Sequence, residues 1–320
     1  MKLGVMSAIF SSMGLKGALD QCKRFGLECI ELGTGAYPGN ALCDAAKLLK
    51  DKKALAEFKA VIADSGVEIS ALSCHGNPLH PDKKLAMAHQ EVHRNSVKLA
   101  KLLGVKVVIN FSGCPGGCET DKRPNWVTCP WPEDYGQALA WQWEKRVIPF
   151  WKAENKFAED NGVKLAFEMH PGFVVYNTET MLRLRSECGK AIGANFDPSH
   201  LFWQGMDPIV SVRALKGCIW HVHAKDCRVD PGNAALNGVL DNKHYGDEWN
   251  RSWIFRTVGF GHGETFWRDF VSTLRLAGYD GVLSIEHEDS LMSANEGFGK
   301  AVSLLRGILL TEKRGAMTWA

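Results

Sequence analysis

Four segments of the chain end in a titratable side chain directly after a short apolar run. Within each segment large apolar residues alternate with small or polar ones, the period of two expected for a β-strand with one packed face. The segments are FEMH (167–170), NFDPSH (195–200), HVHAKD (221–226) and SIEHED (284–289). Their small and polar faces end at Glu168, Asp197, His223 and Glu286. These four residues are the first candidates for chemistry.

Three carboxylates and an imidazole that converge on one point repel one another unless a cation lies between them. Oxygen-rich ligation with one nitrogen favours Mn²⁺, Mg²⁺ or Co²⁺ over a structural zinc site. We therefore expect one divalent metal ion, Mn²⁺ first, with Mg²⁺, Co²⁺ or Zn²⁺ as alternatives. The competing interpretation is four unrelated strand ends, each hydrogen-bonded locally. The shared register of the four segments argues against it.

The rest of the chain alternates short strands with helices, which is typical of parallel βαβ units. Eight strands are expected, at 3–7, 29–32, 68–73, 105–111, 163–169, 191–197, 218–224 and 282–287. This number predicts a closed (β/α)8 barrel, a single domain over residues 1–320, with extended loops after strands 4 and 7. An open doubly wound sheet is less favoured, because no turn carries G-x-G-x-x-G or a P-loop. In strand seven, Trp220 and Val222 are expected to face the helices, and His221 and His223 the barrel interior.

Composition narrows the class of protein. Hydrophobic residues make up 45% and charged residues 23% of the sequence, with a formal net charge of +2. The near-neutral net charge and the ordinary hydrophobic content predict no nucleic-acid or membrane partner. No apolar run approaches the roughly 20 residues of a membrane span. Ten scattered cysteines suit a reducing compartment, so a cytoplasmic location is expected.

Other polar residues lie near the expected strand ends and are candidates for contact with a substrate. His200 follows Asp197 by three positions, and His170 follows Glu168 by two. Candidates placed by the same reasoning are His75 after strand three, Asp226 after strand seven, and Arg256 in the long connection before strand eight.

At this point the sequence resembles a known group. FEMHP, NFDPSH, HVHAKD and SIEHED, in this order, are similar to motifs of the xylose isomerase-like TIM-barrel superfamily, which includes ketose 3-epimerases, inosose dehydratases and endonuclease IV. The resemblance implies metal ligation by Glu168, Asp197, His223 and Glu286. It also implies that Glu168 and Glu286 form an acid/base pair on opposite faces of a sugar substrate, and that the protein forms a homo-oligomer.

The first functional hypothesis is a metal-dependent isomerase or epimerase of a keto-sugar or sugar derivative. The metal would stabilise the enediolate formed when one carboxylate removes the α-proton, and the other would return a proton. Ketose 3-epimerases carry a further Glu and Arg where this chain has Val174 and Val229. Arg228, next to Val229, is therefore a further candidate for substrate binding, and a simple free ketose is a doubtful substrate.

Three alternatives remain. A lyase, such as an inosose-type dehydratase or a keto-glycoside eliminase, would use the same metal and base. An endonuclease IV-like hydrolase needs further His and Asp ligands, whereas the fourth strand ends in Asn110 and Ser112. A non-catalytic sugar-binding barrel would not need two opposed carboxylates. Because no Gly-rich phosphate cradle follows strands seven or eight, an unphosphorylated substrate is expected.

Three further patterns lie outside the expected strand ends. His89 and His93 have the i, i+4 spacing of a helical zinc pair, but Gln90 replaces the required Glu, so a solvated helix face is expected. Cys114, Cys118 and Cys129 are unevenly spaced for zinc. Trp126 and Trp131 are candidates for an aromatic wall over a sugar.

Overall fold

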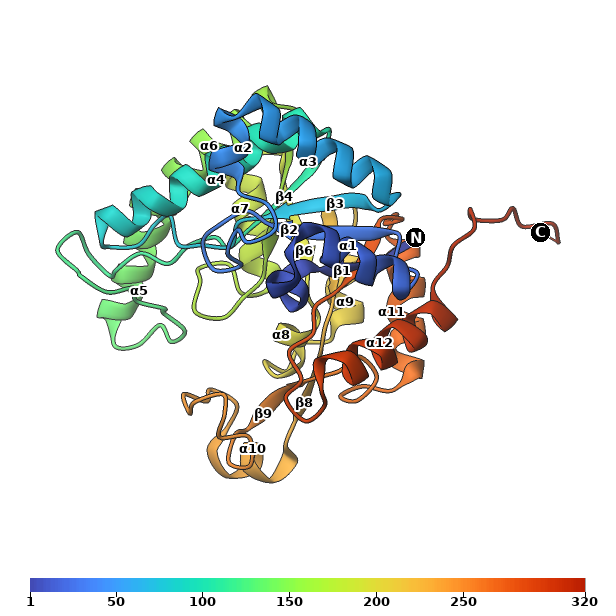
Figure 1. Ribbon diagram of the computed structural model, residues 1–320. Helices are drawn as coiled ribbons and strands as arrows, with labels where there is room; N and C mark the ends of the chain where they lie inside the picture. Colours follow the sequence, from blue (N-terminus) through green and yellow to red (C-terminus); the bar gives the residue numbers. More distant parts are fainter. Residues whose placement is uncertain (320) are drawn as a thin grey trace.

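The computed structural model describes residues 1–319 and contains a closed barrel of eight parallel strands (Figure 1). Around the barrel the strands follow the order β1-β2-β3-β4-β5-β6-β7-β10, and β10 pairs with β1 to close it. The predicted (β/α)8 fold is thus confirmed. The barrel strands are β1 (Lys2–Met6), β2 (Cys29–Gly33), β3 (Glu68–Ser73), β4 (Val107–Asn110), β5 (Lys164–Glu168), β6 (Ile192–Phe196), β7 (Ile219–Ala224) and β10 (Val282–Ile285).

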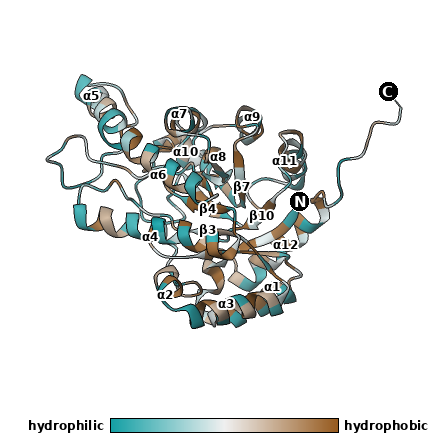
Figure 2. Cartoon of the chain, turned by 90° about the horizontal axis from the view of Figure 1, so that it is seen from above, coloured by the Kyte–Doolittle hydropathy of each residue, from teal (hydrophilic) through white to brown (hydrophobic). Residues whose placement is uncertain are grey.

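Helices surround the barrel, with hydrophilic colours on many of their outward surfaces (Figure 2). Their inner faces bury large side chains against the strands, and Trp151, Trp267 and Phe298 are among the most completely buried residues. The helices are α1 (Gly14–Arg24), α2 (Ala45–Lys50), α3 (Lys52–Ser65), α4 (Lys83–Leu103), α5 (Glu133–Trp141), α6 (Ile148–Asp160), α7 (Thr178–Cys188), α8 (Ser199–Phe202), α9 (Pro208–Ala214), α10 (Pro231–Asn237), α11 (Glu264–Leu276) and α12 (Ala294–Ile308). Two short helical segments of other types, η1 (Ser7–Met13) and η2 (Gln142–Val147), directly precede α1 and α6.

Two extended connections depart from the simple alternation of strand and helix, at the places predicted. After β4, an irregular segment leads into α5 and α6. After β7, the chain forms β8 (Asp226–Val229), α10 and β9 (Trp253–Arg256) before it reaches α11. β8 and β9 pair in antiparallel fashion and project from the barrel with α10 (Figure 1). This pair was not predicted, and we call residues 226–256 the β8–β9 insert.

The orientation of Trp220 was predicted wrongly. The β6–β7 register shifts between Ala194 and Asn195, so that Ala194 pairs with Ile219 but Asn195 with His221. This irregularity leaves Trp220 as the extra residue of a bulge, which re-aims a side chain. Its indole packs against Ala71, Val107, Ile109 and Ala166 and lies over Gly193, inside the barrel. His221 and His223 face the barrel interior as predicted, since both contact Glu31.

Within residues 1–319, no helix is long and apolar enough to cross a membrane.

Candidate active site and metal centre

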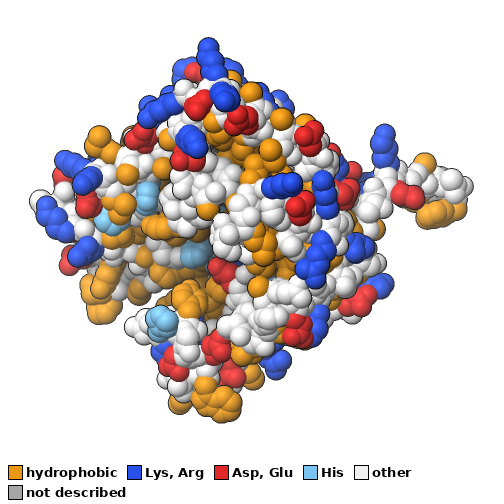
Figure 3. All heavy atoms as spheres, viewed as in Figure 1, with side chains coloured by type: hydrophobic (Ala, Val, Ile, Leu, Met, Phe, Trp, Pro, Cys, Tyr) orange, Lys and Arg blue, Asp and Glu red, His pale blue; other side chains and the backbone are white. Residues whose placement is uncertain are grey.

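A cavity of about 720 Å³ opens at the carboxyl ends of the barrel strands, next to the β8–β9 insert. In the space-filling view the molecule is hollowed above the insert, with histidine and acidic side chains showing in the hollow (Figure 3). Glu168 and Glu286 line this cavity together with Lys225, His75 and His170. Its size is that of a small-molecule site.

The four residues singled out from the strand ends meet in this region. Glu168, Asp197, His223 and Glu286 each offer a ligand atom, and these atoms all lie within 4.8 Å of one another. A cation bound at about 2.2 Å from each ligand would hold opposite ligands about 4.4 Å apart. The spacing therefore suits one ion. The structure brings the four residues together, and their metal-binding role remains a prediction.

The hydrogen bonding of the cluster also fits a cation. Asp197 Oδ2 and Glu286 Oε2 are buried and accept no hydrogen bond, although His200 Nε2 and His223 Nδ1 lie 3.4 and 3.0 Å from them. A buried carboxylate oxygen without a donor costs free energy, which a metal ion at this point would offset. The other oxygen of Asp197 is satisfied, because Oδ1 accepts from the backbone N–H of Ser199 at 2.8 Å. The unpartnered oxygens are thus the ones left for a ligand.

Glu168 is held by several neighbours at once. Its Oε2 accepts from Asn195 Nδ2 at 3.1 Å and lies 3.0 Å from His75 Nε2. Its Oε1 lies 3.2 Å from His200 Nε2, which is also 3.4 Å from Asp197 Oδ2. These contacts fix the carboxylate at the cavity floor. Although burial alone would raise it, the pKa of Glu168 lies well below its usual range because His200, His223 and His75 surround it.

Glu286 has a cationic partner on the same cavity wall. Lys225 Nζ lies 3.3 Å from Glu286 Oε1 and 2.6 Å from Glu288 Oε2, and the Lys225 side chain is almost completely buried. Burial would lower the pKa of Lys225, but Glu286 and Glu288 raise it well above the ordinary value. Lys225 is therefore an ammonium ion that faces the site.

Asp197 differs from the other two carboxylates of the cluster. Burial raises its pKa to about 6, against the attraction of His200 and Lys225, and the smaller repulsion by Glu168 and Glu286 adds to the effect of burial. The pKa of Glu286, in contrast, is lowered, because Lys225 and His223 overcome the effect of burial. Among the protein groups alone, Asp197 is thus the carboxylate that a proton occupies first.

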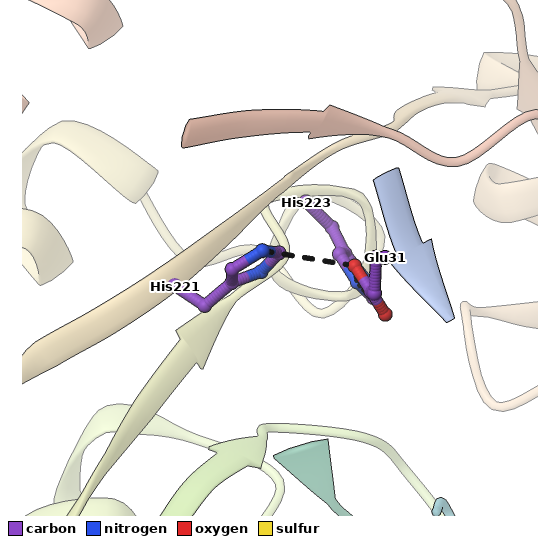
Figure 4. A group of neighbouring side chains, drawn as sticks. All are labelled: Glu31, His221 and His223. Carbon is purple, nitrogen blue, oxygen red and sulfur yellow. Dashed lines mark hydrogen bonds and ion pairs between the residues drawn. The ribbon is translucent and has the colours of Figure 1, made fainter. Parts of the chain in front are cut away.

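Glu31 is a buried residue of this region that the sequence reasoning missed. It lies in the middle of β2, is fully buried, and faces His221 and His223 of β7 across the barrel (Figure 4). Burial would raise its pKa, but His223, with help from His221 and Ser73, holds it at about 2. The signal was available in the sequence, because CIELG is a short apolar strand with a carboxylate between Ile30 and Leu32.

Three of the residues predicted to bind substrate lie in or beside the cavity. His75 and His170 line it, and His200 contacts the ring of His170 at a centroid distance of 4.1 Å. Burial, reinforced by the neighbouring His200, lowers the pKa of His170 to about 3, so this ring is neutral at physiological pH. Its Nδ1 bonds to the carbonyl oxygen of Pro171 at 2.6 Å.

The structure does not place the other three in the cavity. The carboxylate of Asp226 turns away and accepts hydrogen bonds from the backbone N–H groups of Gly259, Gly261 and His262, so it holds the loop after β9. Arg228 is exposed on β8, where it pairs with Ile254. Arg256 Nε bonds to Asp289 Oδ2 at 3.1 Å. Arg228 thus points to solvent, and Asp226 and Arg256 bind segments that follow the insert, contacts that the sequence did not reveal.

The histidine pair of α4 is not on a solvated face, contrary to the prediction. His93 is buried and its Nδ1 lies 2.8 Å from Asn110 Oδ1, while His89 Nδ1 accepts from the backbone N–H of Asn77. Both rings therefore stabilise the packing of α4 on the barrel.

The cysteines and tryptophans of the segment after β4 divide between the interior and the surface. Cys114 is buried, while Cys118 and Cys129 are exposed, and no metal-capable group in the described part of the chain contains any of them. Trp126 packs on Tyr176 and lines a smaller cavity beside His170 and His200, whereas Trp131 is exposed. Only Trp126 is placed for the predicted aromatic wall.

The fold and the site define a (β/α)8-barrel protein whose strand ends carry a carboxylate-rich candidate metal centre on the floor of a cavity. The family model described as xylose isomerase-like TIM barrel matches residues 19–308, and the chain belongs to this family.

Individual similarities agree with this assignment. The chain is 38% identical over 309 residues to the uncharacterized protein YfiH of Bacillus subtilis (strain 168), covering 96% of this chain and 98% of YfiH. Two solved structures have a TM-score of 0.65: the probable 3-DHS dehydratase AsbF from Bacillus anthracis (15% identity, 96% and 99% of the two chains) and the 3-keto-D-glucoside 4-epimerase YcjR from E. coli (14%, 96% and 99%). The structure of the IOLI protein with a binding zinc atom has a TM-score of 0.64 (20%, 97% and 98%). At these identities the structural likeness is one of fold.

Proposed function

We propose that this protein is a divalent-metal-dependent isomerase or epimerase that acts on an uncharged keto-sugar or keto-sugar derivative. The observation that carries the proposal is the placement of two buried or half-buried carboxylates, Glu168 from β5 and Glu286 after β10, on the floor of one cavity. Both approach His223 Nδ1, at 3.2 and 3.0 Å, from strands separated by β6 and β7. Such a pair can remove a proton from one face of a carbon and return it on the other.

The protein groups suit a bound divalent ion, Mn²⁺ first by the predominance of carboxylates. Glu168, Asp197, His223 and Glu286 would hold it, and the structure of the IOLI protein with a binding zinc atom supports a divalent ion in this fold. When bound, the ion supplies Lewis-acid polarisation of a substrate carbonyl. Because the pKa values of Glu168 and Glu286 are lowered, both are ionised and weakly basic, so the proton they remove must be acidic.

The charges around the cavity favour an uncharged substrate. Its acidic lining residues are Glu168, Glu248, Glu286 and Glu288, and its lysine, Lys225, is already paired with two of them. No arginine within residues 1–319 lines the cavity. Phosphate and carboxylate groups are usually bound by unpaired Arg or Lys donors. A phosphorylated sugar would therefore meet net repulsion here.

The apolar part of the lining fits a sugar ring. Tyr37, Phe111 and Phe255 line the cavity, and Phe111 packs against His75 at a ring-centroid distance of 4.5 Å. Aromatic faces pack against the C–H surfaces of a ring while the polar groups bind its hydroxyls. His75 and His170 are proposed to contact these hydroxyls from the cavity wall, with His200 behind them.

A lyase is the second candidate, and Lys225 is the observation that favours it. An ammonium beside the cavity can stabilise the negative charge that develops on a departing hydroxyl or alkoxyl group. The names of AsbF and YcjR, a dehydratase and an epimerase, correspond to the two candidate reaction types. The reaction must therefore be distinguished by its product.

The experiment is proton exchange observed by NMR. Mn²⁺-loaded protein is incubated in D₂O with free ketohexoses, an inosose and a 3-keto-glucoside, and the quenched, metal-stripped mixtures are examined. Deuterium at one carbon without loss of another group supports an isomerase or epimerase, whereas a dehydrated or unsaturated product supports a lyase. The 6-phosphates of the ketohexoses are expected to show no exchange. If no substrate of the panel exchanges a C–H proton, the proposal fails.

A further inference from the structure

The barrel interior below the candidate metal centre holds a further carboxylate. Glu31 is fully buried there, and its carboxylate lies against His223 Nε2, at 3.1 Å from Oε1 and 2.9 Å from Oε2. The other nitrogen of the same ring, Nδ1, faces Glu168 and Glu286 of the candidate metal centre. His223 thus contacts both Glu31 and the carboxylates of the candidate metal centre.

The carboxylate of Glu31 is held in one orientation. The hydroxyl of Ser73, at the end of β3, donates to Oε1, and the hydroxyl of Ser284, on β10, donates to Oε2 at 2.9 Å. Each oxygen therefore has a serine donor and shares the imidazole N–H of His223. Because strands on both sides of β2 and across the barrel supply these donors, the carboxylate cannot turn away from His223 without losing buried hydrogen bonds.

Glu31, His221 and His223 are themselves close enough to suggest a second metal site (Figure 4). Their hydrogen bonds argue against it. His221 Nδ1 lies 3.0 Å from Asn195 Oδ1, so it carries the proton of that bond, and His221 Nε2 is 3.4 Å from the hydroxyl of Ser70. In the described chain no atom of Glu31 or His221 is buried without a partner, whereas Asp197 Oδ2 and Glu286 Oε2 are. The lone pairs that need a cation lie on the other side of His223.

We propose that Glu31 is a positioning residue for metal binding, which accepts the Nε2–H of His223 and thereby keeps Nδ1 unprotonated and directed at Glu168, Asp197 and Glu286. A neutral imidazole carries one proton, and a carboxylate that accepts it at Nε2 selects the tautomer with a free lone pair at Nδ1. A metal-ligating histidine commonly donates its second N–H to a carboxylate, which fixes the ring and strengthens the ligand. The inference rests on the metal centre of the proposed function.

The amide of Asn195 supports the same assignment independently. Because its Oδ1 faces His221 Nδ1, its Nδ2 is directed to the other side, where it donates to Glu168 Oε2 and lies 3.2 Å from His223 Nδ1. The direction of Asn195 Nδ2 is thus compatible with a lone pair on Nδ1, which is the tautomer that Glu31 selects at Nε2.

The test compares Glu31→Gln with Glu154→Gln. Glu154 is also a buried carboxylate, but its partners are Arg94 and His93 of α4, remote from the ligands. Mn²⁺ and Zn²⁺ affinities are measured by competition with a chelator, after circular dichroism has shown that each metal-free variant is folded. Glu31→Gln is expected to bind 10- to 100-fold more weakly than the wild type, and Glu154→Gln within about twofold of it. Equal affinities of Glu31→Gln and wild type would overturn the inference.

A second measurement does not require the Glu31→Gln variant to fold. In ¹⁵N-histidine-labelled, Zn²⁺-loaded wild type, long-range ¹H–¹⁵N correlation is expected to show His223 protonated at Nε2 and metal-bound through Nδ1, with the signals assigned by their loss in His223→Gln. Protonation at Nδ1 would overturn the role of Glu31 even if the metal binds. If the wild type binds neither Mn²⁺ nor Zn²⁺, the metal centre of the proposed function fails, and the inference fails with it.

Discussion

Lys225 Nζ lies 3.3 Å from Glu286 Oε1, so a buried ammonium stands beside a carboxylate that is also a candidate metal ligand. A second carboxylate, that of Glu288, lies 2.6 Å from the same nitrogen at the rim of the cavity. Glu286 thus has two sources of positive charge beside it, the ammonium group of Lys225 and the ion that the cluster is expected to hold. Lys225 also packs over the ring of Phe255, which keeps it on the cavity wall.

Lys225→Met is expected to change turnover and metal affinity differently. Removal of a positive charge near the cluster relieves its repulsion of a divalent ion, so Mn²⁺ binding should be unchanged or up to about tenfold tighter. Turnover should fall at least about tenfold, because Glu286 loses its partner and the site loses a stabilising charge. Metal titration measures the affinity, and kcat at saturating Mn²⁺ measures turnover. Lys164→Met, at the start of β5, is the control variant. Weaker metal binding with unchanged turnover in Lys225→Met would contradict the argument.

Glu286→Gln is expected to abolish most of the activity while leaving the fold intact. The amide cannot accept the substrate proton, and loss of general acid–base catalysis typically costs 10²- to 10⁴-fold in rate. The assay is run at saturating Mn²⁺, so that weakened metal binding does not account for the loss, and circular dichroism monitors the fold. Glu264→Gln, at the exposed start of α11, should retain wild-type turnover. Full activity of Glu286→Gln would remove Glu286 from the mechanism.

Glu154 should make the stability of the protein pH-dependent in the acid range. Burial would raise its pKa, but His93, Arg94 and Gln90 hold the pKa at about 2, below the 4.5 of a free carboxyl. A folded-state pKa below the unfolded value means that the contribution is fully present above pH 4.5 and is lost as the pH falls towards 2. By linkage it amounts to about 3 kcal/mol at pH 7.

Urea denaturation of the wild type and Glu154→Gln at pH 7, 5 and 3 measures this contribution. The difference in the free energy of unfolding should be constant at pH 7 and 5 and shrink at pH 3. Glu159→Gln, exposed on the same helix α6, should show no such difference. A gap between wild type and Glu154→Gln that persists unchanged at pH 3 would exclude the ion pair as its cause.

Gly193→Ala tests the bulge in the barrel. A Cβ at this position would lie 2.2 Å from Trp220 Nε1 and 2.5 Å from the carbonyl oxygen of Cys218, so β6 or β7 would have to move. Overpacking of this kind costs about 3 kcal/mol. Gly307→Ala on α12, where a Cβ meets nothing within 4 Å, should instead be neutral or stabilising by up to about 1 kcal/mol. Thermal unfolding distinguishes the two, and equal stabilities would refute the packing of Trp220 over Gly193.

The barrel and the four converging residues could be predicted because both follow from local periodicity. In β5, the alternation of Leu165 and Phe167 with Ala166 and Glu168 tells which side chains face inward. In a parallel barrel all strand ends point to the same rim, so inward-facing end residues must approach one another. The bounds of the strands differ from the prediction by at most two residues. Between β2 and β3 the chain forms two helices, α2 and α3, because Asp51 caps the second one.

The insert could not be predicted, because its side chains respond to contacts made far along the chain. Asp226 was expected near the site because it directly follows strand seven, but the backbone N–H groups of Gly259, Gly261 and His262 surround its carboxylate. Lys225, one residue earlier, has the inward parity of His221 and His223 and faces the cavity. The loop after β9 holds the carboxylate of Asp226 away from the site.

The sequence by itself therefore determined the (β/α)8 fold and the meeting of Glu168, Asp197, His223 and Glu286, because a period of two and a common strand direction are local properties. Only the tertiary structure decided that Glu31 lies 2.9 Å from His223, 192 positions away, and that a bulge turns Trp220 into the barrel. These contacts cross the barrel, and their geometry depends on how the sheet closes, which no single strand encodes.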